Sequence, residues 1–179
     1  MVDKDKKINI AFNGFGRIGR NLVRKLVKDT KYNIVAINAR TTTSVRAHLF
    51  KYDSIHGHFD GTIETELDNL IINDQTIPNF DRSTPAKLPW GELDVDYVID
   101  STGKFNDKHS LSQHIEAGAK NVIVTAPAAD VDATLIYGVN ETDYKIQENN
   151  IVSASSCTTT CLTPILKVLQ KQYGIKHGY

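Results

Sequence analysis

The sequence predicts an α/β fold built on a doubly wound, mostly parallel sheet. Short apolar runs alternate with segments of helical periodicity over most of the chain, and the first apolar run leads directly into a glycine-rich turn. Strands that alternate with helices favour parallel pairing, because each helix carries the chain back across the sheet. One segment differs: residues 62–80 alternate apolar and polar side chains around Asn73 and Asp74, which predicts a β-hairpin inserted near an edge of the sheet.

The first elements form a β-α-β unit of about thirty residues. Residues 8–12 and 33–37 are short apolar runs and are expected to be strands. Residues 17–28 place apolar side chains at helical spacing and are expected to form the helix between them. A crossover of this length joins parallel strands with a right-handed sense.

The same pattern resumes after the hairpin. Further strands are expected at residues 97–100, 121–125, 134–137 and 150–153, with a helix at 108–117 that Gly118 ends. A last, longer helix is expected at residues 155–173, and its apolar face consists of Leu162, Ile165, Leu166 and Leu169. That face needs a partner, and none follows within the 179 residues. We therefore expect a complete sheet domain at residues 1–155 and the start of a truncated second domain at 156–179.

Composition excludes several classes of protein. The 21 basic and 21 acidic side chains cancel and 40% of residues are hydrophobic, which argues against a disordered tail or a basic nucleic-acid arm. No apolar run approaches the roughly 18 residues of a membrane span, and residues 1–7 lack the apolar stretch of a secretory signal. His56 and His58 have no third ligand nearby, so no metal site is expected. A cytoplasmic protein without membrane or nucleic-acid partners is the expectation.

The stretch Asn13–Gly19 follows a predicted strand and opens a predicted helix with the pattern G-x-G-x-x-G. Gly14 would permit the tight turn, Gly16 would let the backbone approach a pyrophosphate, and Gly19 would let helix and strand pack closely. The N–H groups at the start of the helix would then face the phosphates. This context favours a Rossmann-type dinucleotide site over a purely structural strand–helix turn.

The position that usually carries a ribose-binding acid is Ala39, about twenty residues beyond the third glycine. Arg40 follows it, and hydroxyl side chains come next. An arginine here can pair with a ribose 2′-phosphate, and no carboxylate repels that group. The pattern favours NADP or use of both cofactors; the alternative is a solvated Arg40 with NAD held through its pyrophosphate.

The stretch 155–161 begins the last predicted helix and contains Cys157 and Cys161. Three consecutive threonines are poor helix formers, so their hydroxyls are expected to cap the helix or to bind an anion. A helix N-terminus favours a thiolate, which makes Cys157 a candidate nucleophile, although free cysteines are more often packing residues. Cys161 lies one turn further on and is expected to be a core residue.

Four stretches together resemble glyceraldehyde-3-phosphate dehydrogenases: residues 13–20 (NGFGRIGR), 51–57 (KYDSIHG), 101–103 (STG) and 155–164 (SSCTTTCLTP). The likeness keeps the same order over nearly the whole chain. By length it covers the first half of such an enzyme, which implies a nucleotide-binding domain and the start of a catalytic domain.

The resemblance implies that Cys157 attacks the aldehyde of glyceraldehyde 3-phosphate, that hydride passes to the nicotinamide, and that inorganic phosphate cleaves the thioester to 1,3-bisphosphoglycerate. Ser156 and Thr158 match positions that contact the substrate or the attacking phosphate. Matches to cofactor-binding positions are Asn13, Gly14, Gly16, Arg17, Ile18, Gly19, Arg40, Arg82, Ser101, Thr102 and Thr125, with Arg82 on the adenine side. The full-length enzyme is expected to be a homotetramer.

Departures from the family pattern leave alternatives open. The usual SNASCTTNC reads SASSCTTTC here, with serine or threonine at some asparagine positions. The activating histidine would fall at position 184, and His177 lies too close to Cys157 to take that role. We therefore expect the 179-residue chain to bind cofactor but to turn over poorly or not at all. The sister family erythrose-4-phosphate dehydrogenase and a non-catalytic nucleotide-binding module are the other interpretations.

Overall fold

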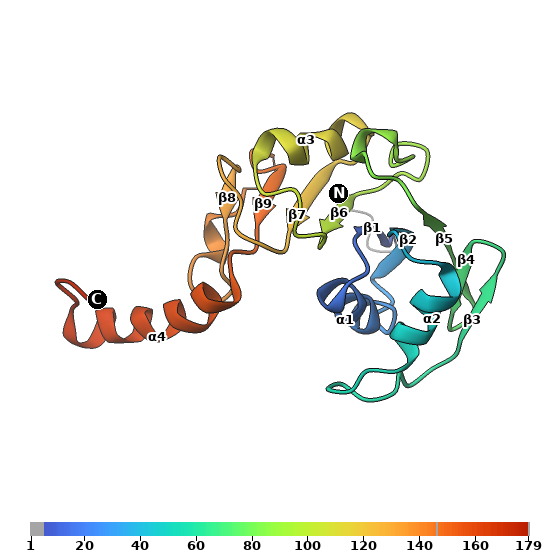
Figure 1. Cartoon of the computed structure of the whole chain (residues 1–179). Helices are drawn as coiled ribbons and strands as arrows, with labels where there is room; N and C mark the ends of the chain where they lie inside the picture. The colour runs from blue at the N-terminus through green and yellow to red at the C-terminus, as the bar shows by residue number, and fades with distance from the viewer. Residues whose placement is uncertain (1–5, 146, 179) are drawn as a thin grey trace.

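The computed structural model describes residues 6–145 and 147–178 and contains a nine-stranded sheet in the order β3-β4-β5-β2-β1-β6-β7-β9-β8 (Figure 1). The strands are β1 (Ile8–Asn13), β2 (Tyr32–Asn38), β3 (Ile63–Glu66), β4 (Asn69–Ile72), β5 (Gln75–Phe80), β6 (Tyr97–Asp100), β7 (Asn121–Val124), β8 (Ala133–Thr134) and β9 (Ile151–Ser153). The helices are α1 (Arg17–Leu26), α2 (Thr43–Lys51), α3 (Lys108–Glu116) and α4 (Cys157–Tyr173), with 3-10 turns η1 (Pro85–Lys87) and η2 (Glu141–Asp143).

The sheet is parallel from β5 to β8 and antiparallel only where β3, β4 and β5 pair. This confirms the predicted α/β fold with a doubly wound, mostly parallel sheet. Strand β1 lies at its centre, with β2 on one side and β6 on the other. Because the chain winds outward in both directions from β1, the carboxyl ends of β1 and β6 form the switch point at which such sheets bind ligands.

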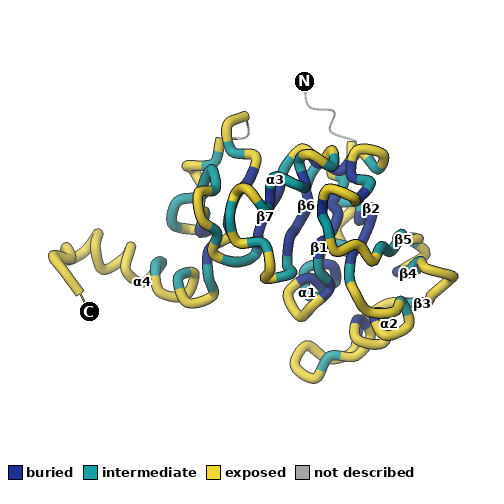
Figure 2. Tube along the Cα trace, turned by 45° about the horizontal axis from the view of Figure 1, so that its top comes forward, coloured by how far each residue is buried: buried dark blue, intermediate teal, exposed yellow. Residues whose placement is uncertain are grey.

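The core forms two layers, one on each face of the central strands, because successive side chains of a strand point to opposite faces. Phe12 of β1 packs with Val23 of α1 and Phe50 of α2, whereas Ala11 packs with Trp90 on the other face. Leu111 brings α3 onto the second half of the sheet, against β7. Most residues of the central strands are buried, and the exposed or half-buried ones lie mainly at the strand starts (Figure 2).

The segment predicted as a β-hairpin, residues 62–80, contains three strands instead of two. The turn at Asn73 and Asp74 joins β4 to β5 as expected, and both residues have the positive φ of a type I′ hairpin turn. A second turn at Leu67, also with a positive φ, adds β3 and makes a three-stranded meander. The turn residues are Leu67 and Asp68; leucine is an unusual residue at a positive φ, so the only turn signal here was Asp68 with Asn69.

Helix α4 projects away from the sheet, and none of its residues is buried (Figures 1 and 2). Its apolar face, predicted to need a partner, is exposed: Leu162, Ile165, Leu166 and Leu169 are 38–56% accessible. One tether joins it to the sheet domain, where Lys167 Nζ donates to the carbonyls of Gly138 and Val139 at 2.9 and 2.8 Å. Across the described residues, no helix has both the length and the apolar character needed to cross a membrane.

Candidate dinucleotide crevice and thiol site

A crevice of about 330 Å³ opens at the carboxyl ends of β1, β2 and β6. It contains residues from three separate sequence predictions: the glycine turn, the position of the missing acid, and the serine and threonine after β6. The predicted cofactor-binding residues that line it are Asn13, Gly14, Gly16, Arg40, Arg82, Ser101 and Thr102. The fold therefore assembles these distant segments around one cavity.

The three glycines of the turn meet different surroundings. A Cβ on Gly14, whose φ is +103°, would lie 2.8 Å from the backbone of Ser101 and Thr102. A Cβ on Gly19 would lie 2.5 Å from the carbonyl oxygen of Gly14, so helix and turn touch there. A Cβ on Gly16 would meet nothing within 4 Å. Gly14 and Gly19 thus permit close packing of the backbone, and Gly16 keeps the approach to the helix start open.

Helix α1 begins immediately after Gly16 and has no acidic residue in its first turn. Its positive end is therefore directed at the crevice without a competing carboxylate on the same turn. Arg17 and Ile18 lie in that first turn with exposed side chains, outside the cavity lining. Only their backbone is placed to face a phosphate.

Arg20 is a crevice residue that the sequence analysis missed. Its Nη1 donates to the carbonyl of Phe15 at 3.0 Å, which fixes the turn from behind. Its Nε is buried and has no partner among the described residues. Burial lowers the pKa of Arg20, and the charge of Asp53 opposes that effect. The available sequence signal was the spacing of Arg17 and Arg20, which lie three residues apart in the helix that follows the glycine turn.

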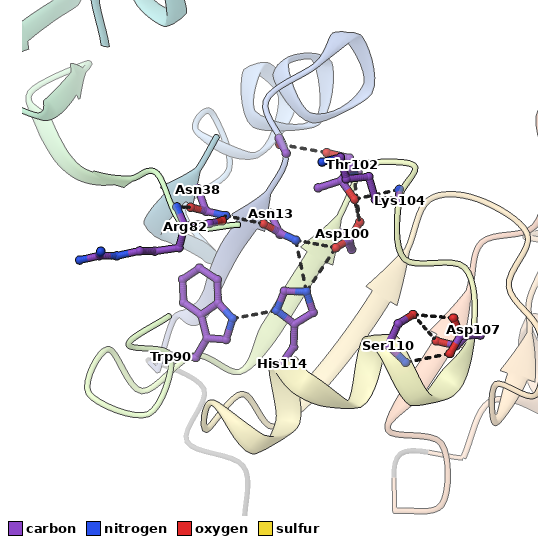
Figure 3. A network of polar contacts seen from close by, with 12 residues as sticks. Asn13, Asn38, Arg82, Trp90, Asp100, Thr102, Lys104, Asp107, Ser110 and His114 are labelled. Atoms are coloured by element: carbon purple, nitrogen blue, oxygen red, sulfur yellow. Dashed lines mark hydrogen bonds and ion pairs between the residues drawn. The ribbon is translucent and has the colours of Figure 1, made fainter. Parts of the chain in front are cut away.

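A chain of buried amides and one carboxylate forms the floor of the crevice (Figure 3). Asn38 Nδ2 donates to Asn13 Oδ1 at 2.7 Å, and Asn13 Nδ2 donates to Asp100 Oδ2 at 2.7 Å. At one end, Asn38 exchanges hydrogen bonds with the backbone N–H and carbonyl of Arg82. At the other end, Thr102 donates to Asp100 Oδ1 from its N–H at 3.0 Å and from its hydroxyl at 2.7 Å. This network therefore holds Arg82 on one side of the crevice and Thr102 on the other.

His114 of α3 supports this floor from below and has no exposed surface. Trp90 Nε1 donates to His114 Nδ1 at 2.9 Å, and His114 Nε2 lies 3.2 Å from Asp100 Oδ2 (Figure 3). An indole N–H can only donate, so Nδ1 must accept and the ring proton sits on Nε2. His114 therefore donates from Nε2 to Asp100. The sequence did not indicate that His114 supports the crevice, because in the sequence it is only a polar residue on a predicted helix.

On the adenosine side, Ala39 is half-buried and Arg40 is exposed, and both line the crevice. Residues 38–41, at the end of β2, include no carboxylate; the carboxylates that line the cavity beside Arg40 are those of Asp68 and Asp81. Thr125 lies elsewhere: its N–H donates to the carbonyl of Asp100 at 2.9 Å, at the end of β7 and outside the lining of the cavity. Thr125 therefore lies beside the end of β6, next to Ser101, but like Arg17, Ile18 and Gly19 it is not part of the cavity lining.

Cys157 is the first residue of α4 and its side chain is exposed. Ser156 is the N-cap: its Oγ accepts from the N–H of Thr159 at 3.0 Å and lies 3.0 Å from the hydroxyl of Thr158. The residue before it, Ser155, is buried with φ +64° and donates from its N–H to Ser153 Oγ at 2.9 Å. A tight turn from β9 thus presents the sulfur and the hydroxyls to solvent at the start of a helix, outside the lining of the crevice.

The expectation that Cys161 is a core residue is wrong, because its side chain is exposed. Helix α4 buries no residue, and Cys161 shares the exposure of most of the helix. Within the described part of the chain, no group of three or more His, Cys, Asp or Glu side chains is arranged to hold a metal ion. Cys157 and Cys161 are therefore two accessible thiols one helical turn apart.

Comparison with known proteins gives two family matches. Residues 8–108 match the model described as "Glyceraldehyde 3-phosphate dehydrogenase, NAD binding domain". Residues 156–179 match the model described as "Glyceraldehyde 3-phosphate dehydrogenase, C-terminal domain". The first match alone spans more than half of the 179 residues.

Curated relatives agree with these models. The chain is 46% identical over 172 residues to glyceraldehyde-3-phosphate dehydrogenase 2 of Bacillus subtilis, covering 96% of this chain and 51% of the relative. It is 45% identical over 171 residues to the glyceraldehyde-3-phosphate dehydrogenase of Priestia megaterium, with 96% and 51% covered. For the enzyme of Mycoplasma pneumoniae the identity is 44% over 181 residues, with 99% and 53% covered. The chain spans about half the length of these relatives, and it belongs to the glyceraldehyde-3-phosphate dehydrogenase family.

Proposed function

We propose that this chain supplies the dinucleotide-binding and nucleophile-bearing part of a phosphorylating glyceraldehyde-3-phosphate dehydrogenase. The observation that carries the proposal is the crevice at the ends of β1, β2 and β6, where Gly16 leaves an open approach to the start of α1 in a chain of this family. An exposed cysteine at the start of α4 supplies the second requirement, an accessible nucleophile.

The proposed division of the chain is a dinucleotide-binding domain at residues 1–155 and the start of a catalytic domain at 156–179. The C-terminal family model begins at residue 156, which supports this boundary. Helix α4 has no buried residue, so it belongs to a packing unit other than the sheet.

The residues of the crevice fit a dinucleotide. The N–H groups at the start of α1, in the turn Asn13–Gly19, would hold the pyrophosphate. Thr102, oriented by Asp100, and Ser101, which donates to the carbonyl of Gly14 at 2.9 Å, would line the nicotinamide side. Arg82, whose backbone is fixed by Asn38, would lie on the adenine side. Thr125 would reach the cofactor only from the end of β7.

The finer proposal is a preference for NADP. The family model supports NAD binding in general. At the end of β2, however, the half-buried Ala39 offers no acceptor for the ribose hydroxyls, and Arg40 beside it brings a cation. A guanidinium recognises a phosphate monoester well, so Arg40 would hold the 2′-phosphate.

In the proposed reaction, the Cys157 sulfur attacks the aldehyde carbon of glyceraldehyde 3-phosphate and its proton passes to a base outside these 179 residues. The resulting thiohemiacetal would lose its hydroxyl proton and give up the hydride on its carbon, for which the bound dinucleotide supplies the acceptor, and so become a thioester. Inorganic phosphate then displaces the sulfur from the resulting thioester, which gives 1,3-bisphosphoglycerate and restores the thiol. Ser156 and Thr158, with the N–H groups of the first turn of α4, would bind oxygens of the substrate and of the attacking phosphate. A homotetramer is the proposed assembly of the whole enzyme.

The test joins residues 1–179 to the C-terminal half of the Bacillus subtilis relative and follows NADPH or NADH absorbance with glyceraldehyde 3-phosphate and inorganic phosphate. We expect turnover that requires both compounds. Cys157→Ser should abolish it, and the matched variant Cys161→Ser should retain it because that thiol lies one turn away from the helix start. Turnover that survives Cys157→Ser, or a folded chimera without dinucleotide binding, would contradict the proposal.

A further inference from the structure

A second cavity, of about 750 Å³, adjoins the crevice and shares Arg40, Thr41 and Arg82 with it. It lies where α2 begins and where β5 ends, on the side of the crevice beyond Ala39. Hydroxyl side chains of the stretch 41–44 line one wall. The cavity therefore continues the adenosine side of the crevice with groups that can donate hydrogen bonds to an anion.

Arg46 of α2 borders this cavity and is only 4% exposed. Its Nη1 donates to Asn79 Oδ1 at 2.9 Å. Its Nη2 donates to the carbonyl of Ala39, and more weakly to that of Phe80 at 3.4 Å. One guanidinium thus joins the end of β2 to the end of β5, directly behind the position where a ribose-binding acid would stand.

The charge of Arg46 has no direct counter-ion. Within the described residues no carboxylate lies at ion-pair distance, and its Nε is buried without a partner. Burial lowers the pKa of Arg46, and the charges of Asp81 and Asp68, on other walls of the same cavity, oppose that effect from a distance. A buried cation without a counter-ion is destabilising, so an anion bound in the cavity would be favoured.

The start of α2 adds to this positive field. The helix has no acidic residue in its first turn, and its N-cap, Thr42, makes no side-chain cap hydrogen bond. Its free N–H groups and helix dipole point toward the same end of the cavity as the hydroxyls. Asp68, in the turn between β3 and β4, and Asp81, after β5, line the same cavity and weaken this field.

We propose that Arg46 is a specificity-determining residue for the dinucleotide, because its buried guanidinium favours a phosphate monoester at the adenosine 2′ position. This inference rests on the proposed dinucleotide-binding function and adds a residue to it. The 2′-phosphate is the group that distinguishes NADP from NAD, and the ribose binds at the end of β2 in this fold. Arg46 acts there in two ways: it supplies charge, and it holds the carbonyl of Ala39 so that the turn 39–42 keeps its hydroxyls toward the cavity.

The test measures dissociation constants of NADP and NAD by calorimetry on the 179-residue chain. Arg46→Met removes the charge and keeps the length of the side chain. We expect this variant to raise the dissociation constant of NADP about tenfold, the loss typical of one charge-assisted contact. The dissociation constant of NAD should change less than about twofold. Arg46→Lys keeps the charge without the planar fork and should give an intermediate loss for NADP alone.

Arg24→Met is the matched control. Arg24 also donates to main-chain carbonyls, those of Phe50 and Gly57, but borders neither cavity. It should leave the ratio of the two constants unchanged. If Arg46→Met weakened the binding of NAD and of NADP equally, Arg46 would only support the loop, and the inference would be overturned. A wild-type chain that binds NAD but shows no preference for NADP would also overturn it, while leaving dinucleotide binding intact.

Inorganic phosphate separates this inference from the proposed function. If the chain binds neither dinucleotide, the proposed function fails, and the thermal shift caused by inorganic phosphate then decides about the cavity. Stabilisation of the wild type and of Arg24→Met, absent in Arg46→Met, would support an anion site at Arg46. No stabilisation of the wild type under those conditions would overturn it.

Discussion

The absence of a Cβ atom at the three glycines of the turn allows the crevice to form. The backbone of Gly14 and Gly19 occupies space in which a Cβ would lie 2.5–2.8 Å from other main-chain atoms. Gly16 is different, because nothing in the protein fills the space beside it. The same residue type therefore serves packing at two positions and ligand approach at the third, and substitution separates these roles.

Gly16→Ala should leave the fold unchanged and weaken dinucleotide binding, because the added methyl group enters open space that a pyrophosphate would occupy. Gly19→Ala should lower the free energy of unfolding by about 1–3 kcal/mol, the usual cost of overpacking. Urea unfolding and calorimetric titration with NAD measure the two effects. Loss of stability in Gly16→Ala would show that its open side is not free in solution.

Ala39→Asp should strengthen NAD binding and weaken NADP binding, each by about tenfold. The new carboxylate can accept both ribose hydroxyls and repels a 2′-phosphate at the same place. Ala39→Asn is the control, since it has the same size without the charge and should not repel NADP. A parallel change in both dissociation constants would place the adenosine ribose away from residue 39.

Sequence periodicity predicted the elements that are defined by a local pattern of apolar residues and glycines. The β-α-β unit and strands β6 and β7 lie within one or two residues of their expected bounds, because apolar spacing and the glycine turn define them. Helix α2 was missed, since its threonine-rich start and mixed faces give no clear period. The strand expected at 134–137 is reduced to the two residues of β8, paired only with β9 at the sheet edge.

The candidate site was predictable in its local parts and not in its long-range contacts. The glycine turn and the cysteine at a helix start are contiguous motifs with a direct physical meaning. The floor of the crevice joins Asn13, Asn38, Asp100 and His114, which are up to 101 positions apart in sequence. Each of these residues, taken singly, is an ordinary polar side chain at the end of a strand or on a helix, so only the folded sheet reveals that they act together.

The stability of the sheet edge formed by β8 and β9 should depend on pH through the carboxylate of Asp132. Its carboxylate accepts from the N–H groups of Asn150 and Ile151 at 3.0 and 2.8 Å and from Lys108 Nζ at 2.5 Å. Burial alone would raise the pKa of Asp132, but the Lys108 ammonium and the two N–H groups together lower it below its ordinary 3.8. A lowered pKa means that this stabilisation is present above pH 3.8 and is lost as the pH falls below it.

Asp132→Asn should therefore reduce the free energy of unfolding by about 1–2 kcal/mol at pH 7, mainly through the lost contact with Lys108. The difference from wild type should shrink as the pH falls below 3.8. Urea unfolding across that range measures it, with the exposed Asp130→Asn as the control. A difference that is independent of pH would show that the carboxylate charge contributes nothing to stability.

At the scale of the molecule, the sheet and α4 differ in what holds them. The sheet domain has buried side chains on both faces, whereas α4 has none and keeps its apolar face exposed (Figure 2). The stability of the sheet therefore does not depend on α4. Helix α4 is held by the Ser156 cap, its own backbone hydrogen bonds, Gly174 at its end and the contact of Lys167 with the carbonyls of Gly138 and Val139. This difference supports the proposed domain boundary near residue 155.

A chain that ends at Ser155 should fold and bind NAD as the 179-residue chain does. Removing α4 exposes no core side chain and deletes the exposed apolar face, so we expect a midpoint of thermal unfolding within about 3 °C and a dissociation constant within about twofold. A chain that ends at Asn149 also loses β9, whose three residues are buried, and should not fold stably. Circular dichroism melts and NAD titration compare the three chains. If the chain ending at Ser155 melted like the one ending at Asn149, α4 would have to stabilise the sheet in solution, and the boundary would fall elsewhere.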